Sequence, residues 1–156
     1  MSLSRHPLNA ARAAAGSAAC ALLLAFALAA SAPGMAADLV VIVSARSAVT
    51  ALSAEQVAEL FLSGVTHYPD GGDAVALDQR VGSPVRDAFY VRVASCSPER
   101  MKAYWTQRLF MGRGRPPREL HGNADVRRDV AANPALIGYI ERRALNPSVR
   151  SVLVLQ

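Results

Sequence analysis

Residues 74–89, AVALDQRVGSPVRDAF, contain a complete strand–turn–helix signal. The short apolar run Ala74–Asp78 predicts a strand, and Gly82 predicts a turn after it. Ser83 can cap a helix that starts at Pro84, because proline suits the first helical position. The apolar positions that follow recur at helical spacing: Val85, Ala88 and Phe89. The stretch therefore predicts one strand–helix unit of an α/β fold.

The flanking sequence continues this alternation. Residues 39–44 (LVVIVS) form an apolar, β-branched run of the kind found in strands buried on both faces of a parallel sheet. Ser53 and Gln56 form a capping box for a helix over 54–63, which Gly64 would end. Further helices are expected after Ser97-Pro98, with an inner face of Met101, Tyr104, Trp105 and Leu109, and from a cap at Asn123; strands are expected at Leu136–Ile140 and Val149–Leu155. The order predicts a three-layer α/β fold with a mostly parallel sheet.

Residues 1–37 have the pattern of a secretory signal peptide. Arg5 and Arg12 precede an apolar run at 18–30, and small residues follow just before Asp38. The run is shorter than the roughly 20 residues that a membrane span needs. An uncleaved N-terminal anchor is the alternative, and both interpretations place residues 38–156 outside the cytoplasm. We therefore expect a periplasmic domain over 38–156.

The composition of residues 38–156 limits the kinds of binding and catalytic site that we expect there. Removal of residues 1–37 leaves an excess of about three scattered positive charges, which suits a small anion and does not suit nucleic acid. Cys20 precedes most of the apolar run, which argues against lipidation, and its loss leaves Cys96 without a disulfide partner. His67 and His121 lie far apart, so we expect no metal and no cofactor. Hydrolase, P-loop and dinucleotide-binding motifs are absent from the sequence, so we expect no enzyme.

The turn before Pro84 has the parts of an anion site. Gly82 and Ser83 offer N–H groups and a hydroxyl at a helix N-terminus, which attracts negative charge. Arg80 can add a charge-assisted hydrogen bond from the end of the strand. The residues alone favour a simpler interpretation, in which Ser83 caps the helix and Arg80 pairs with Asp78 or Asp87. Pro84 also removes one N–H group from the turn.

Several short motifs follow one another in a family-like order: LFLSG at 60–64, the turn Tyr68–Gly71, residues 78–89, Tyr104-Trp105 and Gly138-Tyr139. They resemble, in turn, the Ile-Phe-Leu-Gly-Lys helix end, the Trp-Asn-Asp turn, the Arg-Ser-Asp-Gly-Ser-Gly-Thr loop, a later Trp, and the Gly-x-Ile-Gly-Tyr-Val strand of periplasmic phosphate-binding proteins of ABC transporters. The resemblance covers Leu39–Ile140. It implies one lobe of a periplasmic-binding-protein type II fold.

The resemblance also implies a function and partners. It implies that Arg80 and Ser83 bind phosphate or a related oxyanion, and that Gly82 forms the turn of the binding loop. Ser44 and Ser47, after the first strand, are further ligand candidates. An ABC transporter permease or another envelope protein is the implied partner. Two copies that pair as a homodimer would rebuild a cleft.

Departures from the family pattern leave an alternative open. Pro84 stands in place of the family's second glycine, Val85 in place of its threonine, and the loop is one residue shorter. Residues 38–156 are about half the size of a two-lobed receptor, so the half-site would be open to water, which screens its charges. The alternative is a ligand-free interaction module of the cell envelope; an exported hydrolase is a third hypothesis without a supporting motif. Tyr104 and Trp105 either line a pocket or, as their spacing favours, pack in the core.

Overall fold

The computed structural model describes residues 38–156. The signal peptide predicted for 1–37 and its Cys20 lie outside these residues. The strands are β1 (Leu39–Ser44), β2 (Val75–Gln79), β3 (Arg118–Leu120), β4 (Leu136–Glu141) and β5 (Val149–Leu155). The helices are α1 (Ala54–Ala58), α2 (Pro84–Ala94), α3 (Pro98–Phe110) and α4 (Asn123–Ala132), with a π-helical turn η1 (Glu59–Ser63) and a 3-10 turn η2 (Arg142–Ala144).

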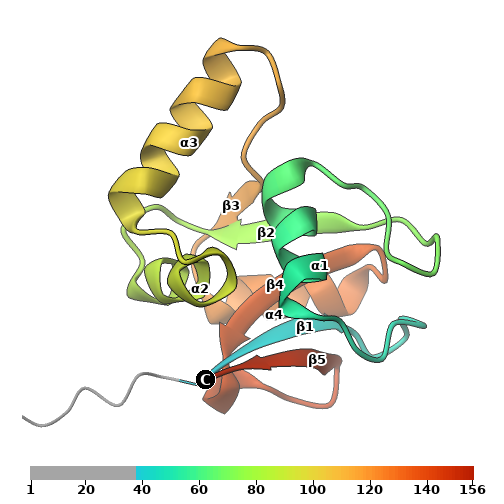
Figure 1. Cartoon of the computed structure of the whole chain (residues 1–156). Helices are drawn as coiled ribbons and strands as arrows, with labels where there is room; N and C mark the ends of the chain where they lie inside the picture. Colours follow the sequence, from blue (N-terminus) through green and yellow to red (C-terminus); the bar gives the residue numbers. More distant parts are fainter. Residues whose placement is uncertain (1–37) are drawn as a thin grey trace, which may run out of the picture. The chain divides into compact units, whose positions relative to one another are not determined.

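The five strands form one mixed sheet in the order β3-β2-β4-β1-β5 (Figure 1). Strand β2 pairs in parallel with β3 and β4, whereas β1 pairs antiparallel with both β4 and β5. Four strands thus share one direction and β1 opposes them, so the prediction of a mostly parallel sheet needs correction at β1. Every residue of β1 is buried, as predicted. A central strand covered on both faces is apolar throughout in either orientation, so its composition could not reveal its direction.

Two apolar clusters lie on the two faces of the sheet. In β1, Leu39, Val41 and Val43 join the cluster formed with α1, η1, α2 and α3, whereas Val40 and Ile42 join the cluster formed with α4. This alternation follows from the two-residue period of a strand. The predicted three-layer arrangement is therefore confirmed. Among the described residues, both faces of the sheet thus carry an apolar cluster covered by helices.

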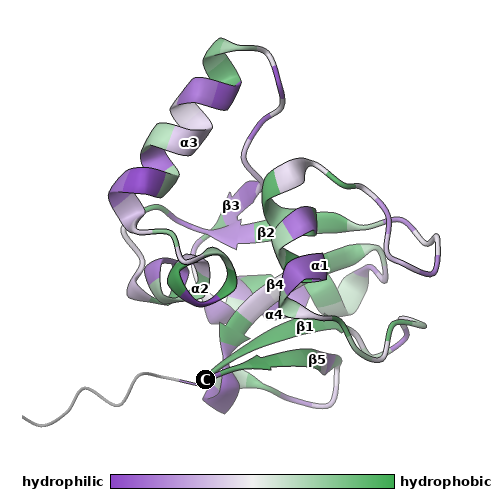
Figure 2. Cartoon of the chain, viewed as in Figure 1, coloured by the Kyte–Doolittle hydropathy of each residue, from purple (hydrophilic) through white to green (hydrophobic). Residues whose placement is uncertain are grey.

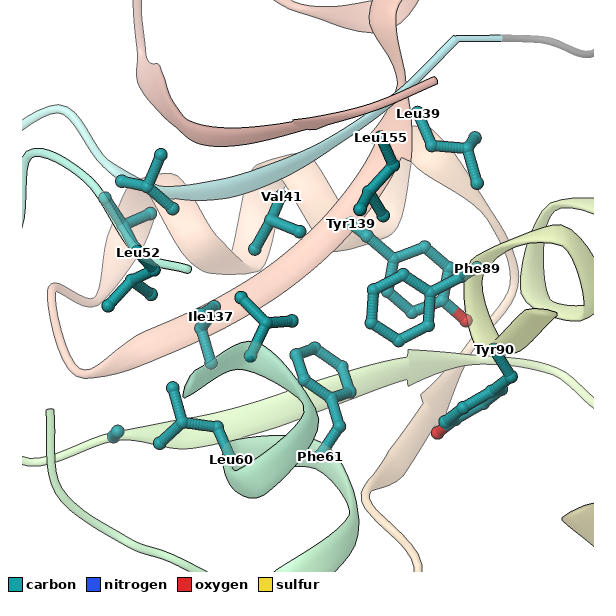
Figure 3. Close-up of a cluster of buried hydrophobic side chains, with 14 of the residues drawn as sticks. Leu39, Val41, Leu52, Leu60, Phe61, Phe89, Tyr90, Ile137, Tyr139 and Leu155 are labelled. Carbon is teal, nitrogen blue, oxygen red and sulfur yellow. The ribbon is translucent and has the colours of Figure 1, made fainter. Parts of the chain in front are cut away.

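Aromatic rings fill the larger cluster where α2 meets β4. Figure 3 shows Phe89 and Tyr139 face to face; their ring centroids are 3.8 Å apart and the planes differ by 4°. Phe61 lies 4.8 Å from Phe89, measured between ring centroids. This stack joins η1, α2 and β4 around one contact. It also positions the hydroxyl of Tyr139 at the carboxyl end of the sheet.

Helix α4 approaches β4 closely at Gly138. A Cβ atom at Gly138 would lie 2.5 Å from Cγ1 of Val126, a distance at which one of the two groups must move. Val126 is fully buried and β-branched, so its side chain has little freedom to move. The glycine of the Gly138-Tyr139 motif therefore lets a helix pack directly on the strand.

The helix ends follow the sequence signals in part. Ser53 and Gln56 form the predicted capping box, with N···O distances of 2.9 and 3.2 Å, and Gly64 ends the segment in the left-handed conformation. The second half of the predicted helix winds as η1 instead of α-helix. The Tyr104 hydroxyl donates to the Leu62 carbonyl at 2.6 Å, which satisfies one carbonyl at this end.

The burial of its side chains decides the expectations for α3. Met101 and Trp105 are buried and Tyr104 packs against them, so core packing is confirmed for these side chains. Leu109 is 50% exposed, so its prediction as an inner residue was wrong. Strand β3 was not predicted.

Cys96 is free and partly buried against the larger cluster. No helix within 38–156 is long and apolar enough to cross a bilayer.

Candidate anion-binding site

The turn between β2 and α2 is a tight, ordered connection. The Ser83 N–H donates to the Arg80 carbonyl at 3.1 Å, and the Arg80 N–H donates to the Leu120 carbonyl of β3 at 3.0 Å. Gly82 has a φ of 82°, a left-handed conformation that costs glycine little. The turn thus holds its shape through the neighbouring strand, while Arg80, Val81 and Gly82 stay exposed.

Ser83 occupies the N-cap position of α2, but its side chain does not cap the helix. Its hydroxyl donates instead to Oε1 of Gln79 at 3.3 Å. The prediction of a hydroxyl cap was therefore wrong. Within 38–156, the N–H groups of Gly82, Val85 and Arg86 have no acceptor, and the first helical bond is from Asp87 to the Ser83 carbonyl. These groups are the usual means by which a helix start holds an anion.

Arg80 belongs to the same turn as these N–H groups, and its side chain is not part of any ion pair among residues 38–156. Its expected pairing with Asp78 does not form, because Arg86 occupies that carboxylate. None of the ion pairs within residues 38–156 joins Arg80 to Asp87. An exposed guanidinium at a strand end can donate two parallel hydrogen bonds to an oxyanion.

A buried polar network braces the turn from inside the sheet. Asp78 is fully buried and accepts hydrogen bonds from four donors. The donors are the Gln79 N–H at 2.8 Å, Nε of Arg86 at 3.0 Å, the Tyr90 hydroxyl at 2.8 Å and the Tyr139 hydroxyl. Because every partner donates, the arrangement suits an ionised carboxylate, which has only acceptor atoms.

The pKa shifts in this network follow from burial and charge. Burial raises the pKa of Asp78, while the Tyr139 hydrogen bond and the charge of Arg86 act in the opposite direction. Burial acts to lower the pKa of Arg86, but the charge and hydrogen bond of Asp78, together with electrostatic contributions from Tyr90 and Tyr139, raise it overall. Burial, and then the charge of Asp78, raise the pKa of Tyr90 and of Tyr139. Both phenols therefore stay protonated and serve as donors.

A line of amides and carboxylates joins the two helix starts at this edge. Nε2 of Gln79 donates to Oδ1 of Asn123 at 3.0 Å, and Nδ2 of Asn123 donates to Oε2 of Glu141 at 2.7 Å. Asn123 is the first residue of α4 and makes these bonds instead of capping it, which corrects the predicted cap. Because Gln79 also accepts from the Ser83 hydroxyl, its side chain links the starts of α2 and α4 at the carboxyl ends of β2 and β4. Ligands of open α/β sheets bind at this kind of position.

Acidic groups also lie at the turn. Oε2 of Glu119 accepts a hydrogen bond from the Val81 N–H at 3.2 Å. This carboxylate takes one N–H group that an anion would otherwise use, and its charge opposes an anion nearby. Glu141 is matched by Arg143, which donates to both of its oxygens at 2.9 and 3.0 Å.

Ser44 and Ser47 lie at the opposite end of the sheet. Because β1 is antiparallel to β4, its last residues meet the beginning of β4, where Val43 pairs with Ile137. The Ser44 hydroxyl donates to the Ala131 carbonyl at 3.3 Å, and the Ser47 hydroxyl accepts from the Val49 N–H at 3.2 Å. The structure thus brings Arg80, Gly82 and Ser83 together and leaves Ser44 and Ser47 apart from them.

Of the histidines in residues 38–156, neither His67 nor His121 makes a hydrogen bond to this network. His67 pairs with Asp73 at 3.5 Å on the surface, and His121 is exposed after β3. No cluster of three or more His, Cys, Asp or Glu side chains that could hold a metal ion occurs in the described part of the chain.

Comparison with known proteins gives a fold but no sequence family. No family model and no curated protein matches the chain. A Clostridium perfringens structure with bound phosphate, described as a phosphate ABC transporter substrate-binding protein, superposes with a TM-score of 0.59 and 20% identity over 75% of this chain and 45% of that one. The chain has the fold of one lobe of such a receptor. An ABC-type phosphate transport receptor from Vibrio cholerae gives a TM-score of 0.58 and 16% identity over 75% of this chain and 47% of that one.

The one-lobe fold agrees with the resemblance found in the sequence. The chain spans less than half the length of both receptors, and each of these neighbours is a transport protein by its description. The sequence proposes Arg80, Gly82 and Ser83 as site residues but does not predict the network behind them. One signal was available: Asp78 ends an apolar strand, and a carboxylate buried there needs partners.

Proposed function

We propose that this protein is an exported solute-binding-type protein that binds phosphate or a related oxyanion at the start of α2. Arg80 would supply a guanidinium, and Gly82, Val85 and Arg86 would supply N–H groups. The Ser83 hydroxyl would turn from Gln79 toward the ligand. The observation that carries this proposal is the uncapped start of α2 beside an unpaired Arg80. The one-lobe fold of phosphate receptors supports it.

Titration calorimetry with phosphate tests this site on the chain that begins at Asp38. Arg80→Ala should weaken binding roughly 10- to 100-fold, because a hydrogen bond to a charged group contributes about 1.5–3 kcal/mol. Arg100→Ala is the matched control, since Arg100 is also exposed and lies in α3. Equal affinity of wild type and Arg80→Ala would show that the site is assigned wrongly.

Glu119 offers a second test at the same turn. Its carboxylate occupies the Val81 N–H, so Glu119→Gln removes a negative charge that competes with the ligand. Phosphate affinity should therefore rise in Glu119→Gln. An unchanged affinity would mean that phosphate, if bound, lies away from Val81.

The Glu119 contact also favours a second candidate function. A turn that already holds a carboxylate of its own chain suits a one-lobe interaction module that serves a partner in the cell envelope. Thermal unfolding separates the two functions, because a ligand that binds only the folded state raises its stability. A phosphate-dependent rise in Tm supports the oxyanion site. Unchanged Tm at high phosphate favours the interaction module, with a permease or a second copy of the chain as partner.

A further inference from the structure

The end of α3 carries three consecutive exposed apolar side chains. Leu109 is 50% exposed, Phe110 93% and Met111 44%. Figure 1 shows α3 extending away from the sheet, and Figure 2 shows hydrophobic colour at its far end, with polar colour in the loop that follows. We name Leu109, Phe110 and Met111 the apolar tip. Exposed apolar groups gathered in this way mark interaction sites.

The apolar tip is held in place by the loop behind it. The Gly112 N–H donates to the Leu109 carbonyl at 3.1 Å, and the Arg113 N–H donates to the Arg108 carbonyl at 2.9 Å. The Arg108 guanidinium returns a bond to the Arg113 carbonyl at 2.8 Å. The same guanidinium donates to the Tyr104 hydroxyl at 3.0 Å, which ties the loop to the body of α3.

Positive charge predominates in the segment that carries the apolar tip, and Arg108, Arg113 and Arg115 are its nearest members in the sequence, whereas Arg118 lies in β3 and pairs with Asp129. Residues 100–118 contain no acidic residue and six basic ones, namely Arg100, Lys102, Arg108, Arg113, Arg115 and Arg118. The rest of 38–156 has more acidic than basic residues. Arg113 and Arg115 follow the tip directly, are exposed, and take part in none of the ion pairs found within 38–156. The tip therefore combines apolar side chains with uncompensated positive charge.

The shape of the tip favours a fluid partner over a flat protein surface. Successive helical residues point about 100° apart, so Leu109, Phe110 and Met111 spread around the end of α3. One rigid face cannot cover all of them, whereas the boundary between lipid headgroups and acyl chains can surround them. We propose that the apolar tip inserts into the surface of an anionic lipid membrane, with Arg113 and Arg115 against the headgroups. This site lies on α3 and its loop, and the proposal does not depend on oxyanion binding.

Vesicle co-sedimentation tests the proposal with the chain from Asp38. Wild type should bind vesicles of mixed phosphatidylglycerol and phosphatidylcholine, and bind pure phosphatidylcholine much more weakly. Phe110→Ala should lower the partition coefficient roughly tenfold, because it removes most of the inserted apolar surface. Arg113→Gln/Arg115→Gln should lower it roughly fivefold for each charge and remove most of its salt dependence.

Matched controls separate the tip from general effects. Val154→Ala removes another exposed apolar side chain, and Arg142→Gln/Arg143→Gln removes the same charge elsewhere. Both should bind anionic vesicles as wild type does. Binding by Phe110→Ala equal to wild type, or no binding by wild type, overturns the proposal. A dimer that Phe110→Ala abolishes in sedimentation velocity, without vesicle binding, assigns the tip to a second copy and also overturns it.

Discussion

Two arginines of one strand–turn–helix have opposite environments. Arg86 is 5% exposed and donates to a buried carboxylate, with its guanidinium carbon 4.9 Å from the centre of the Tyr90 ring. Arg80, six positions earlier, is exposed at the turn and joins none of the ion pairs within 38–156. The same residue type thus has a structural role in the helix and a free charge in the turn. Burial and partners, and not residue type, distinguish a brace from a candidate ligand group.

The largest expected effect comes from breaking the brace. Asp78→Ala leaves Arg86 buried and charged without its partner, and it leaves two tyrosine hydroxyls without an acceptor. The free energy of unfolding should fall by about 3–5 kcal/mol. Urea unfolding followed by circular dichroism measures this change.

Two further variants sharpen this prediction. Asp78→Asn/Arg86→Met should recover part of the loss, because no buried charge remains. Asp73→Ala removes an exposed carboxylate and should cost less than about 1 kcal/mol. A loss in Asp78→Ala as small as that in Asp73→Ala would contradict the bracing role.

The next effect concerns the close packing that positions Tyr139. Gly138→Ala places a methyl group against Val126, and such overpacking costs about 1–3 kcal/mol. The same unfolding assay measures it. Adding Val126→Ala should relieve the clash, so a double variant that loses the full sum of both single effects would argue against this contact.

The loss of a helix cap should have a smaller effect on stability. It should distinguish α1 and α3, whose N-cap serines cap the helix, from α2, whose N-cap serine does not. Ser53→Ala and Ser97→Ala each remove a hydroxyl that caps a helix and should cost about 1 kcal/mol. Ser83→Ala should cost less, because its hydroxyl bonds Gln79 and not the helix N–H groups. Equal losses at all three serines would mean that Ser83 caps α2 in solution.

The smallest effect on stability is expected at Arg80. Arg80→Ala should change the free energy of unfolding by less than about 0.5 kcal/mol in phosphate-free buffer, as for most surface substitutions. Arg86→Ala, measured beside it, should be destabilising by several times that amount, since Asp78 then lacks its cation. A large loss in Arg80→Ala would show that the turn depends on Arg80 for its structure.

Local signals in the sequence predicted most elements of this fold. The capping box at Ser53, Pro84 at the start of α2 and the apolar run of β1 each depend on neighbouring residues, and each prediction was confirmed. Strand β3 was missed because it is three residues long, mostly exposed and without apolar alternation. The direction of β1 was missed because burial on both faces says nothing of orientation.

The sequence could predict the turn residues of the candidate site, but it could not predict the contacts between distant residues that hold the turn in place. The turn residues Arg80, Gly82 and Ser83 are adjacent in sequence, so their common position could be inferred. The bond from Tyr139 to Asp78 spans 61 positions and depends on how β4 lies beside β2. The hydrogen bond from the Ser83 hydroxyl to Gln79 depends on a side-chain orientation that a capping pattern does not determine.

The antiparallel placement of β1 affects the order in which the chain can fold. Both neighbours of β1, β4 and β5, come from residues 136–155, although β1 is the first strand. Such distant pairing is slow to form, and it cannot begin until these late residues have left the ribosome. During synthesis β1 therefore has no partner strand until residues 136–155 have emerged. Protease sensitivity of β1 in chains stalled before residue 136, and its loss once residue 155 has emerged, would test this order of events.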